Sequence, residues 1–456
     1  MARYRLHAIL FALGLVAYGA IAWDRIGKQS QAPQFVVQAD AWLHGHTNVE
    51  PPFVDADWAK IETVALDDGT EVRGRRMSTR PLFHPLHGDN IPIARVKSSR
   101  GLAWYMSFPP LPTLLMLPSA AISGRDGNDV IPTLLIAALI LPLAFSVLRR
   151  LAAAGLSKRT EREDLWLVAA LAFGTVAFFA CVQGKVWYTA QVIGLVLALA
   201  YAWASIEAKR PILAGIALGA AALTRTPMAF MFPLFVLELW RVNGGRAGLR
   251  DARRTVLRAY GRPLLRFAIP VAVFAIAGMI YNYIRFESPT EFGHTFLDVR
   301  QQQQIEQWGL ANYHYLSRNL TVALTLLPDW LGQKPWVQVS GHGLALWITT
   351  PAFLLLLWPR ETNPLHRTLW ITVACVAIPS LFYMNSGWVQ FGYRFSLDYT
   401  VFLVMLLAIG ARPLGRVAKA LIIIGILINL FGAVTFDRSW QYYRVGGNTY
   451  DVVVAH

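Results

Sequence analysis

Long apolar runs, each close to the length that crosses a lipid bilayer, limit most strongly how this chain can fold. They lie at residues 7–23, 130–148, 165–182, 186–206, 267–284, 344–358, 369–384, 399–409 and 417–436. A helix needs about 20 residues to cross the hydrocarbon core, so the shorter runs must include flanking residues. Charged residues make up only 15% of the chain, whereas a soluble globular domain carries about 25%. The sequence therefore predicts an all-α polytopic membrane protein.

The first apolar run is compatible with a cleaved signal peptide or with a retained helix. Arg3 and Arg5 precede it, and Ala20-Ile21-Ala22 fits a signal-peptidase site. Because many further spans follow, we interpret residues 1–23 as a retained first transmembrane helix.

Basic residues concentrate in short segments between the apolar runs, namely 149–164, 209–210, 241–266, 360–367 and 412–419. Short basic loops face the cytoplasm. This rule predicts a cytoplasmic N-terminus, a C-terminus outside, and long outer segments at 24–108 and 285–342 with a short one at 385–398. The formal charge of +15 would suggest nucleic acid in a soluble protein, but these loops account for it and we expect no nucleic-acid partner.

Two apolar segments break the simple pattern. Residues 109–123 are short and rich in proline, and we interpret them as a juxtamembrane or re-entrant helix on the outer side. Residues 211–240 have basic flanks at both ends and a Thr-Arg-Thr-Pro break at 224–227. Two abbreviated helices there would leave Arg225 recessed in a cavity. The resulting topology has 11 crossings.

The first outer segment is expected to hold its own small structure. The pattern at residues 34–43 predicts an amphipathic helix. The alternation at residues 60–76 predicts a β-hairpin around Asp-Asp-Gly, and residues 102–108 are expected to form a strand. The chain then divides into a first helix (1–23), an outer loop (24–129), a transmembrane module (130–284), a second outer loop (285–342), C-terminal helices (343–436) and an outer tail (437–456).

No Walker, GxGxxG, GxSxG or HExxH sequence occurs, so the substrates of an enzyme with large outer loops should lie outside or in the membrane. The layout resembles the GT-C superfamily of polyprenyl-phosphate-sugar-dependent glycosyltransferases, which includes protein O-mannosyltransferases and the aminoarabinose transferase of lipid A. The resemblance rests on the long loop after the first helix, on Pro109-Pro110 and on the motifs at 223–227, 282–289 and 392–395.

This resemblance implies an inverting transfer of a sugar from a polyprenyl-phosphate donor to an acceptor glycan, lipid or protein outside the membrane. It also implies an integral protein of the bacterial inner membrane, surrounded by membrane lipids. A transporter or flippase is the first alternative, although it would show short loops and internal repeats. An O-antigen ligase or polymerase would place its largest outer loop late in the chain, and a non-catalytic assembly factor is the third alternative.

The proposed chemistry needs a carboxylate that takes the proton of the acceptor hydroxyl. GT-C enzymes carry an acidic residue soon after the first helix, often as an Asp-Glu pair, which this sequence lacks. Asp40 is favoured because it is a lone acid on a largely apolar helix, although it could simply face water. Asp24 at the membrane edge is the second candidate, followed by Asp55 or Asp57.

Cationic side chains would hold the donor phosphate. Arg225 is the first candidate because a charge recessed in the membrane is costly, although it could instead snorkel to the headgroups. Arg394 is the second, unless it forms a salt bridge with Asp398. Lys185 could be a ligand or an interfacial anchor, and Tyr393 beside Arg394 is a further candidate for substrate binding.

Histidines in the first outer loop raise the question of a metal. His44 and His46, close to Asp40, could hold the divalent ion that some GT-C enzymes use beside the donor phosphate. Their spacing matches no standard site, and we therefore favour histidines that lie at a surface or contact the substrate.

Overall fold

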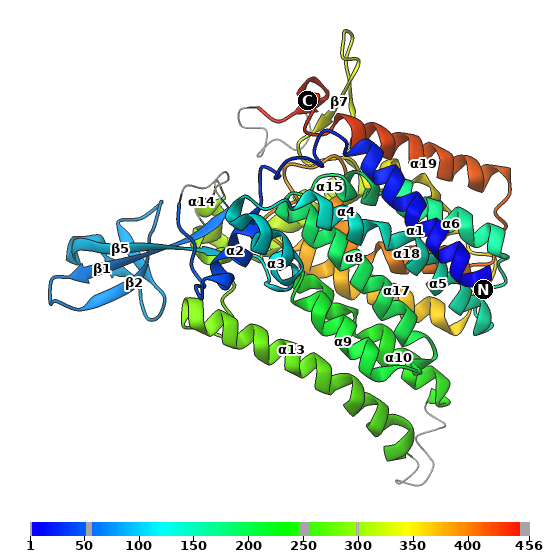
Figure 1. Ribbon diagram of the computed structural model, residues 1–456, viewed down its shortest axis with the longest axis horizontal. Helices are drawn as coiled ribbons and strands as arrows, with labels where there is room; N and C mark the ends of the chain where they lie inside the picture. Colours follow the sequence, from blue (N-terminus) through cyan, green and yellow to red (C-terminus); the bar gives the residue numbers. More distant parts are fainter. Residues whose placement is uncertain (1, 52–56, 246–255, 298, 300, 447–456) are drawn as a thin grey trace.

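The computed structural model describes residues 2–51, 57–245, 256–297, 299 and 301–446. Figure 1 shows a bundle of helices with a β-sheet extending from one end. We refer to this end of the bundle as the sheet end and to the other as the basic end. The expectation of an all-α chain is wrong in this respect, because eight strands form two small sheets in the described part.

In the described part of the chain, five helical stretches are long and apolar enough to cross a membrane. They comprise α1 (Ala2–Ile21), the pair α4 (Val130–Ala138) and α5 (Ile140–Ala153), α8 (Val186–Ser205) with its 3₁₀ extension, α13 (Arg262–Phe286) with the turn before it, and α19 (Arg416–Thr435). The protein is therefore an integral membrane protein. The count of eleven crossings and the side on which each terminus lies stay predictions.

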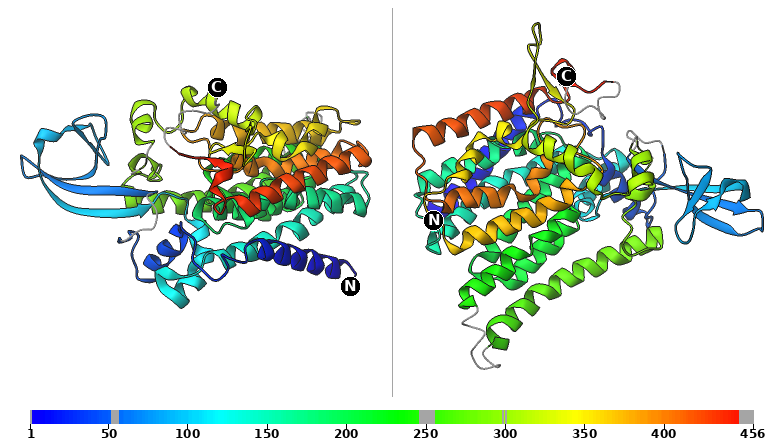
Figure 2. Two further views of the ribbon diagram at one scale, coloured as in Figure 1. Left: turned by 90° about the horizontal axis from the view of Figure 1, so that it is seen from above. Right: turned by 180° about the vertical axis from the view of Figure 1, so that it is seen from behind.

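The core of the bundle is built around α18 (Leu397–Ile409), in which every residue is buried. A helix that is apolar all round belongs in such an interior. Its neighbours are α8, α17 (Pro364–Leu381), α5 and α6 (Glu161–Phe173), and α6 in turn contacts α7 (Ala177–Cys181). By contrast, α1, α13 and α19 lie at the edge of the bundle (Figure 2), and no more than a third of the residues in their apolar stretches are buried.

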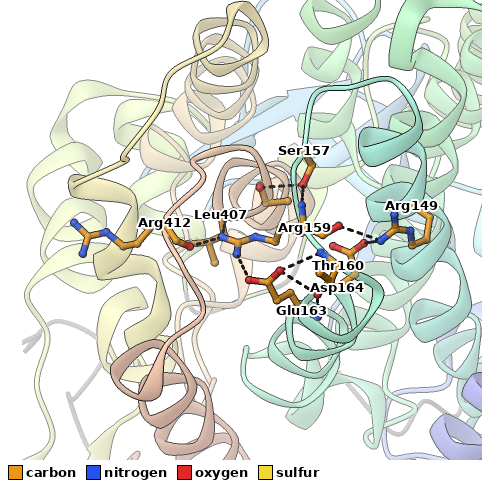
Figure 3. A network of polar contacts seen from close by, with 9 residues as sticks. Arg149, Ser157, Arg159, Thr160, Glu163, Asp164, Leu407 and Arg412 are labelled. Carbon is orange, nitrogen blue, oxygen red and sulfur yellow. Dashed lines mark hydrogen bonds and ion pairs between the residues drawn. The ribbon is translucent and has the colours of Figure 1, made fainter.

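Several of the basic segments meet at the basic end. Figure 3 shows Arg149 paired with Asp164 at 2.7 Å, and Arg159 donating hydrogen bonds to the carbonyls of Leu407 and Arg412 at 2.7 and 2.8 Å. Thr160 and Glu163 close a capping box at the start of α6. Segments 149–164 and 412–419, grouped by charge alone in the sequence, thus lie together in space.

The larger sheet has the strand order β4-β3-β2-β1-β5, with all neighbours antiparallel. Its strands are β1 (Trp58–Leu66), β2 (Glu71–Arg76), β3 (Leu82–Pro85), β4 (Ile91–Pro92) and β5 (Val96–Met106). The predicted hairpin is confirmed, and Gly69 has a φ of +86° in its turn, a value that favours glycine. The predicted strand at 102–108 begins six residues earlier, at Val96.

The short helices expected near the membrane are present. They are α2 (Gln34–Leu43), which packs on α3 (Leu111–Ser123), and α9 (Pro211–Ala222), which a 3₁₀ turn (Thr226–Met231) separates from α10 (Pro233–Val242). Small residues let α13 approach α9, because a Cβ on Gly215 would lie 2.2 Å from the Phe267 carbonyl oxygen.

The second outer segment covers the base of the larger sheet. It contains α14 (Gln302–Trp308), α15 (Leu316–Leu324), β6 (Asp329–Trp330) and β7 (Val337–Ser340), and the short helix α16 (Leu346–Thr349) follows it. β8 (Tyr443–Arg444), which follows α19, joins β6 and β7 in the second sheet. Ion pairs from Arg73 to Glu287 and from Arg75 to Glu306 attach the larger sheet to this segment.

Candidate functional site

A cavity of about 340 Å³ lies where the base of the larger sheet meets the sheet end of the helix bundle. Its wall comes from the start of α8, the break between α9 and α10, the end of α17 and the second outer segment. Most of the lining is apolar, and the charged side chains in it are Asp57, Arg225 and Arg394. Cavities of this size with a few polar groups are typical of small-molecule sites.

Arg394 is the buried cation of this cavity. It is 5% exposed, and its buried Nε atom has no hydrogen-bond partner among the residues that the structure describes. Its guanidinium lies against the rings of Tyr188 and Phe395, at 5.1 and 5.6 Å. Among the described residues, no carboxylate forms an ion pair with it. A buried charge without a counter-ion is costly, so this position favours an anionic ligand.

The turn that carries Arg394 is held firmly. The backbone N–H of Arg394 donates to Gln390 Oε1 at 2.9 Å, and Gln191 Nε2 donates to the Arg394 carbonyl at 3.1 Å. A Cβ on Gly392 would come within 2.7 Å of Val176, so the turn packs tightly on the bundle. These contacts hold the backbone of Arg394 in place at the cavity wall.

Arg225 lies in the break between the abbreviated helices, as expected, but its charge is already paired. Its Nε and Nη2 donate to the two carboxylate oxygens of Asp398 at 2.5 and 2.8 Å. The alternative of an Arg394–Asp398 salt bridge is therefore wrong, since Asp398 binds the other arginine. Both guanidiniums lie near the ring of Phe395, with Arg225 at 5.4 Å.

Asp57 is the carboxylate on the cavity wall. It directly precedes β1, and its Oδ2 accepts a hydrogen bond from Trp187 Nε1 at 2.9 Å. Trp187 and Tyr188 are neighbours in the first turn of α8, so one turn of helix contacts both Asp57 and Arg394. The arrangement places a carboxylate and a cation without an ion-pair partner among the described residues in the wall of one cavity.

The other acidic candidates lie elsewhere. Asp24 binds Arg438 through two hydrogen bonds, from Nη2 at 2.5 Å and from Nε at 2.9 Å, and this contact lowers the pKa of Asp24. Asp40 lies 3.6 Å from His44 on its own helix. Neither side chain lines the cavity. Asp55 lies outside the described residues.

Lys185 and Tyr393 also lie away from the cavity lining. The Lys185 ammonium binds Asp437 at 2.7 Å and Gln31 at 2.9 Å, which ties the start of α8 to the end of α19. Tyr393 is buried and its hydroxyl has no hydrogen-bond partner. Its neighbour Arg394, rather than Tyr393 itself, faces the cavity.

The histidines considered for a metal do not fit that role. Within the described ranges, no group of three His, Cys, Asp or Glu side chains could hold a metal ion. His44 is exposed, and its ring nitrogen Nδ1 contacts the Asp40 carbonyl of the preceding turn at 2.9 Å. We derive no step through a metal.

His294 lines the cavity and was not identified from the sequence. Burial, with a smaller contribution from Arg285, lowers its pKa to about 4, so the ring is neutral at pH 7. Its ring makes edge contacts with Phe108 and Tyr383. A neutral imidazole can both donate and accept a hydrogen bond, which suits an uncharged hydroxyl. No local motif marks this histidine, because its neighbours come from distant segments.

Comparisons with known proteins add little. No known family model matches the sequence, and no curated protein matches it. Among solved structures, the chain is similar to the Archaeoglobus fulgidus oligosaccharyltransferase in its apo form, with 11% sequence identity and a TM-score of 0.42. The similarity covers 97% of this chain and 56% of the archaeal one, so this chain spans about half the length of that protein. A likeness this weak does not bear on activity.

Proposed function

We propose that the protein is a membrane glycosyltransferase of the GT-C type, which transfers a sugar from a polyprenyl-phosphate donor to an acceptor at the sheet end of the bundle. One observation carries the proposal: the buried, unpaired Nε of Arg394 shares a cavity with Asp57. The first of these groups would bind a phosphate and the second would accept a proton, which are the two functions that the reaction needs.

The reaction is a single displacement. The acceptor hydroxyl oxygen attacks the anomeric carbon of the donor sugar, while the bond from that carbon to the phosphate oxygen breaks. Asp57 takes the hydroxyl proton, and the electron pair of the broken bond leaves with the polyprenyl phosphate. Arg394 stabilises the negative charge that develops on the leaving phosphate, from the wall of a cavity whose lining is mostly apolar.

Hydrophobic residues offer a route for the polyprenyl chain. Pro227 and Phe230, from the break, and Pro379, from α17, line the cavity on the side of the helices. Phe230 is 43% exposed, although it lies in a helical segment of the bundle. An apolar wall that continues to an exposed aromatic ring would let the lipid tail remain in the bilayer while its phosphate reaches Arg394.

Donor binding is the decisive test. Purified protein in lipid nanodiscs should bind a polyprenyl phosphate, and Arg394→Ala should weaken this binding by about ten- to a hundredfold, the value of one charge-assisted contact. Arg394→Lys should retain part of it, because lysine keeps the charge and loses the planar fork. Arg100→Ala, which removes an exposed charge from β5, is the matched control.

Two results would contradict the proposal. One is wild-type affinity in Arg394→Ala. The other is movement of lipid-linked sugar across a vesicle membrane without any transfer to an acceptor, which would favour a transporter.

A further inference from the structure

A β-hairpin in the second outer segment extends away from the rest of the molecule. β6 and β7 form it, with Asp329 opposite Gln338 and Trp330 opposite Val337. Figure 1 shows the hairpin at the top, pointing upward, whereas the larger sheet extends from the bundle to the left. The view from behind in Figure 2 shows the same direction.

The base of the hairpin lies level with the ends of two peripheral helices. β7 pairs with β8, which follows α19 by a few residues, through Val339 with Tyr443 and Ser340 with Arg444. Figures 1 and 2 place the ends of α1 and α19 at this same level. Each of these helices has 20 residues, about 30 Å of helix, so each ends close to a membrane surface. The hairpin therefore leaves the bundle at the surface of the bilayer.

Contacts between the hairpin and the chain that follows α19 hold it in its direction. Arg444 Nε donates to Asp329 Oδ2 at 3.0 Å, and Gln338 Nε2 donates to the Gln441 carbonyl at 2.9 Å. At the tip, the backbone N–H of Leu331 donates to the Trp336 carbonyl at 2.9 Å. The hairpin is thus held to the chain that follows α19 and extends over the space beside the bundle.

The tip carries side chains that suit a membrane interface. Trp330 is 80% exposed and Trp336 is 57% exposed, and Leu327 before them is 50% exposed. Lys334 lies between the two tryptophans and is also exposed. Tryptophan is enriched where headgroups meet the acyl chains, and lysine reaches toward the headgroups. In water, such a concentration of exposed aromatic surface would favour aggregation.

Two other exposed tryptophans lie close to the same ends of α1 and α19. Trp23, two residues beyond the end of α1, is 77% exposed, and Trp440, beyond the end of α19, is 44% exposed. Together with the hairpin tip they form the kind of aromatic layer that membrane proteins place at an interface.

We propose that the hairpin is a membrane anchor that inserts Trp330 and Trp336 into the headgroup layer beside α19. The occupant of this surface is the lipid interface itself, since the peripheral helices that fix its level are covered by lipid. The anchor does not depend on the proposed enzymatic activity. The hairpin is also connected to the cavity wall. The backbone N–H of Gln390 donates to the carbonyl of Gly341, at the base of the hairpin, at 3.1 Å, and the Gln390 side chain accepts a hydrogen bond from the Arg394 N–H.

Site-directed labelling in the full chain tests the anchor. A fluorophore on Gln333→Cys at the hairpin tip is compared with one on Thr70→Cys, at the exposed turn between β1 and β2. Cys375→Ala removes the partly exposed native thiol, and Cys181 is buried. The protein is placed in nanodiscs of phosphatidylethanolamine and phosphatidylglycerol that contain lipids spin-labelled at a shallow position.

The anchor predicts that the label at residue 333 is quenched by the spin-labelled lipid and loses its quenching by aqueous iodide, while the label at residue 70 shows the reverse. Replacing both Trp330 and Trp336 by serine should move the signal of Gln333→Cys toward that of Thr70→Cys. Lys334→Cys gives a second labelling position should the first perturb the turn. Equal quenching at residues 333 and 70 would overturn the proposal, as would protection from iodide only after a soluble glycan or protein is added.

Discussion

Arg225 and Asp398 form a two-point ion pair between segments 173 residues apart, with Asp398 only 1% exposed. It joins the break after α9 to the first turn of α18, the most buried helix of the bundle. Because the pair satisfies the charge of Arg225, the unpaired cation of the cavity is Arg394. Two arginines that look equivalent in the sequence thus have different roles in the structure.

The ion pair predicts a stability effect that is separate from activity. Asp398→Leu leaves the Arg225 charge buried without compensation and should destabilise the protein by about 3–5 kcal/mol. Combining it with Arg225→Met should restore much of that loss, since an apolar pair of similar size avoids the desolvation cost. Thermal unfolding in detergent measures both variants. A double variant no more stable than Asp398→Leu would show that the pair does not interact as described.

Asp57 should be the carboxylate on which turnover depends. Asp57→Asn keeps the shape and can still contact Trp187, but it cannot take a proton from the acceptor, so transfer should fall by about 10²–10⁴-fold. Binding of the polyprenyl phosphate should remain near the wild-type level. Asp40→Asn and Asp24→Asn are the parallel controls, as both side chains lie outside the cavity lining. Loss of transfer in either control, with normal turnover in Asp57→Asn, would move the base to that residue.

Local patterns made the short elements predictable. A proline before an apolar run predicted the helix at 34–43, and Asp-Asp-Gly between alternating residues predicted the hairpin. Thr-Arg-Thr-Pro between two apolar runs predicted the break at 224–227. In each, the determining residues are neighbours in the chain, so spacing alone carries the signal.

The site depends on contacts that no local pattern contains. Asp57 and Trp187 are 130 residues apart, and Arg225 and Asp398 are farther apart still. The sequence favoured Asp40 because a lone acid on an apolar helix needs an explanation. In the structure its side chain is 23% exposed and lies beside His44 on the same helix. The sequence could identify costly charges but not which of them the fold pairs.

His294 predicts a pH dependence of stability. The unfolded chain binds a proton on this ring below a pH of about 6.5, whereas the folded protein does so only below a pKa of about 4. Between these values the unfolded state takes up the extra proton, so stability falls as the pH falls from 6.5 toward 4 and is unaffected above 6.5. The loss should be on the order of 1–3 kcal/mol.

His294→Gln removes the titrating group and should flatten the melting temperature between pH 7 and pH 5 relative to the wild type. Replacing the exposed His44 by Gln is the matched control and should leave the wild-type slope intact. An identical slope in wild type and His294→Gln would mean that other groups account for the acid sensitivity.

Glu306 should hold the larger sheet against the membrane bundle. Its carboxylate accepts hydrogen bonds from Arg75 at 2.8 Å, from the Ser78 N–H at 2.9 Å, and from the N–H and hydroxyl of Thr79 at 3.1 and 2.5 Å. Burial alone would raise the pKa of Glu306, but these contacts lower it to about 2. The stability that it contributes is therefore complete above a pH of about 4.5 and is lost as the pH falls toward 2.

Glu306→Gln should destabilise the protein by about 3–5 kcal/mol, because it leaves the charge of Arg75 buried without a partner. Glu62→Gln, which breaks an ion pair to the half-exposed Arg76 within the sheet, is the matched control and should cost about 1 kcal/mol or less. Limited proteolysis gives a second measurement, since a sheet released from α14 should be cleaved in its turns while the helices persist. If the two variants lost equal stability and were cleaved equally slowly, Glu306 would be an ordinary surface contact. The sheet would then be held by its apolar base, where Ala59 and Tyr105 pack against Phe286 and Phe296.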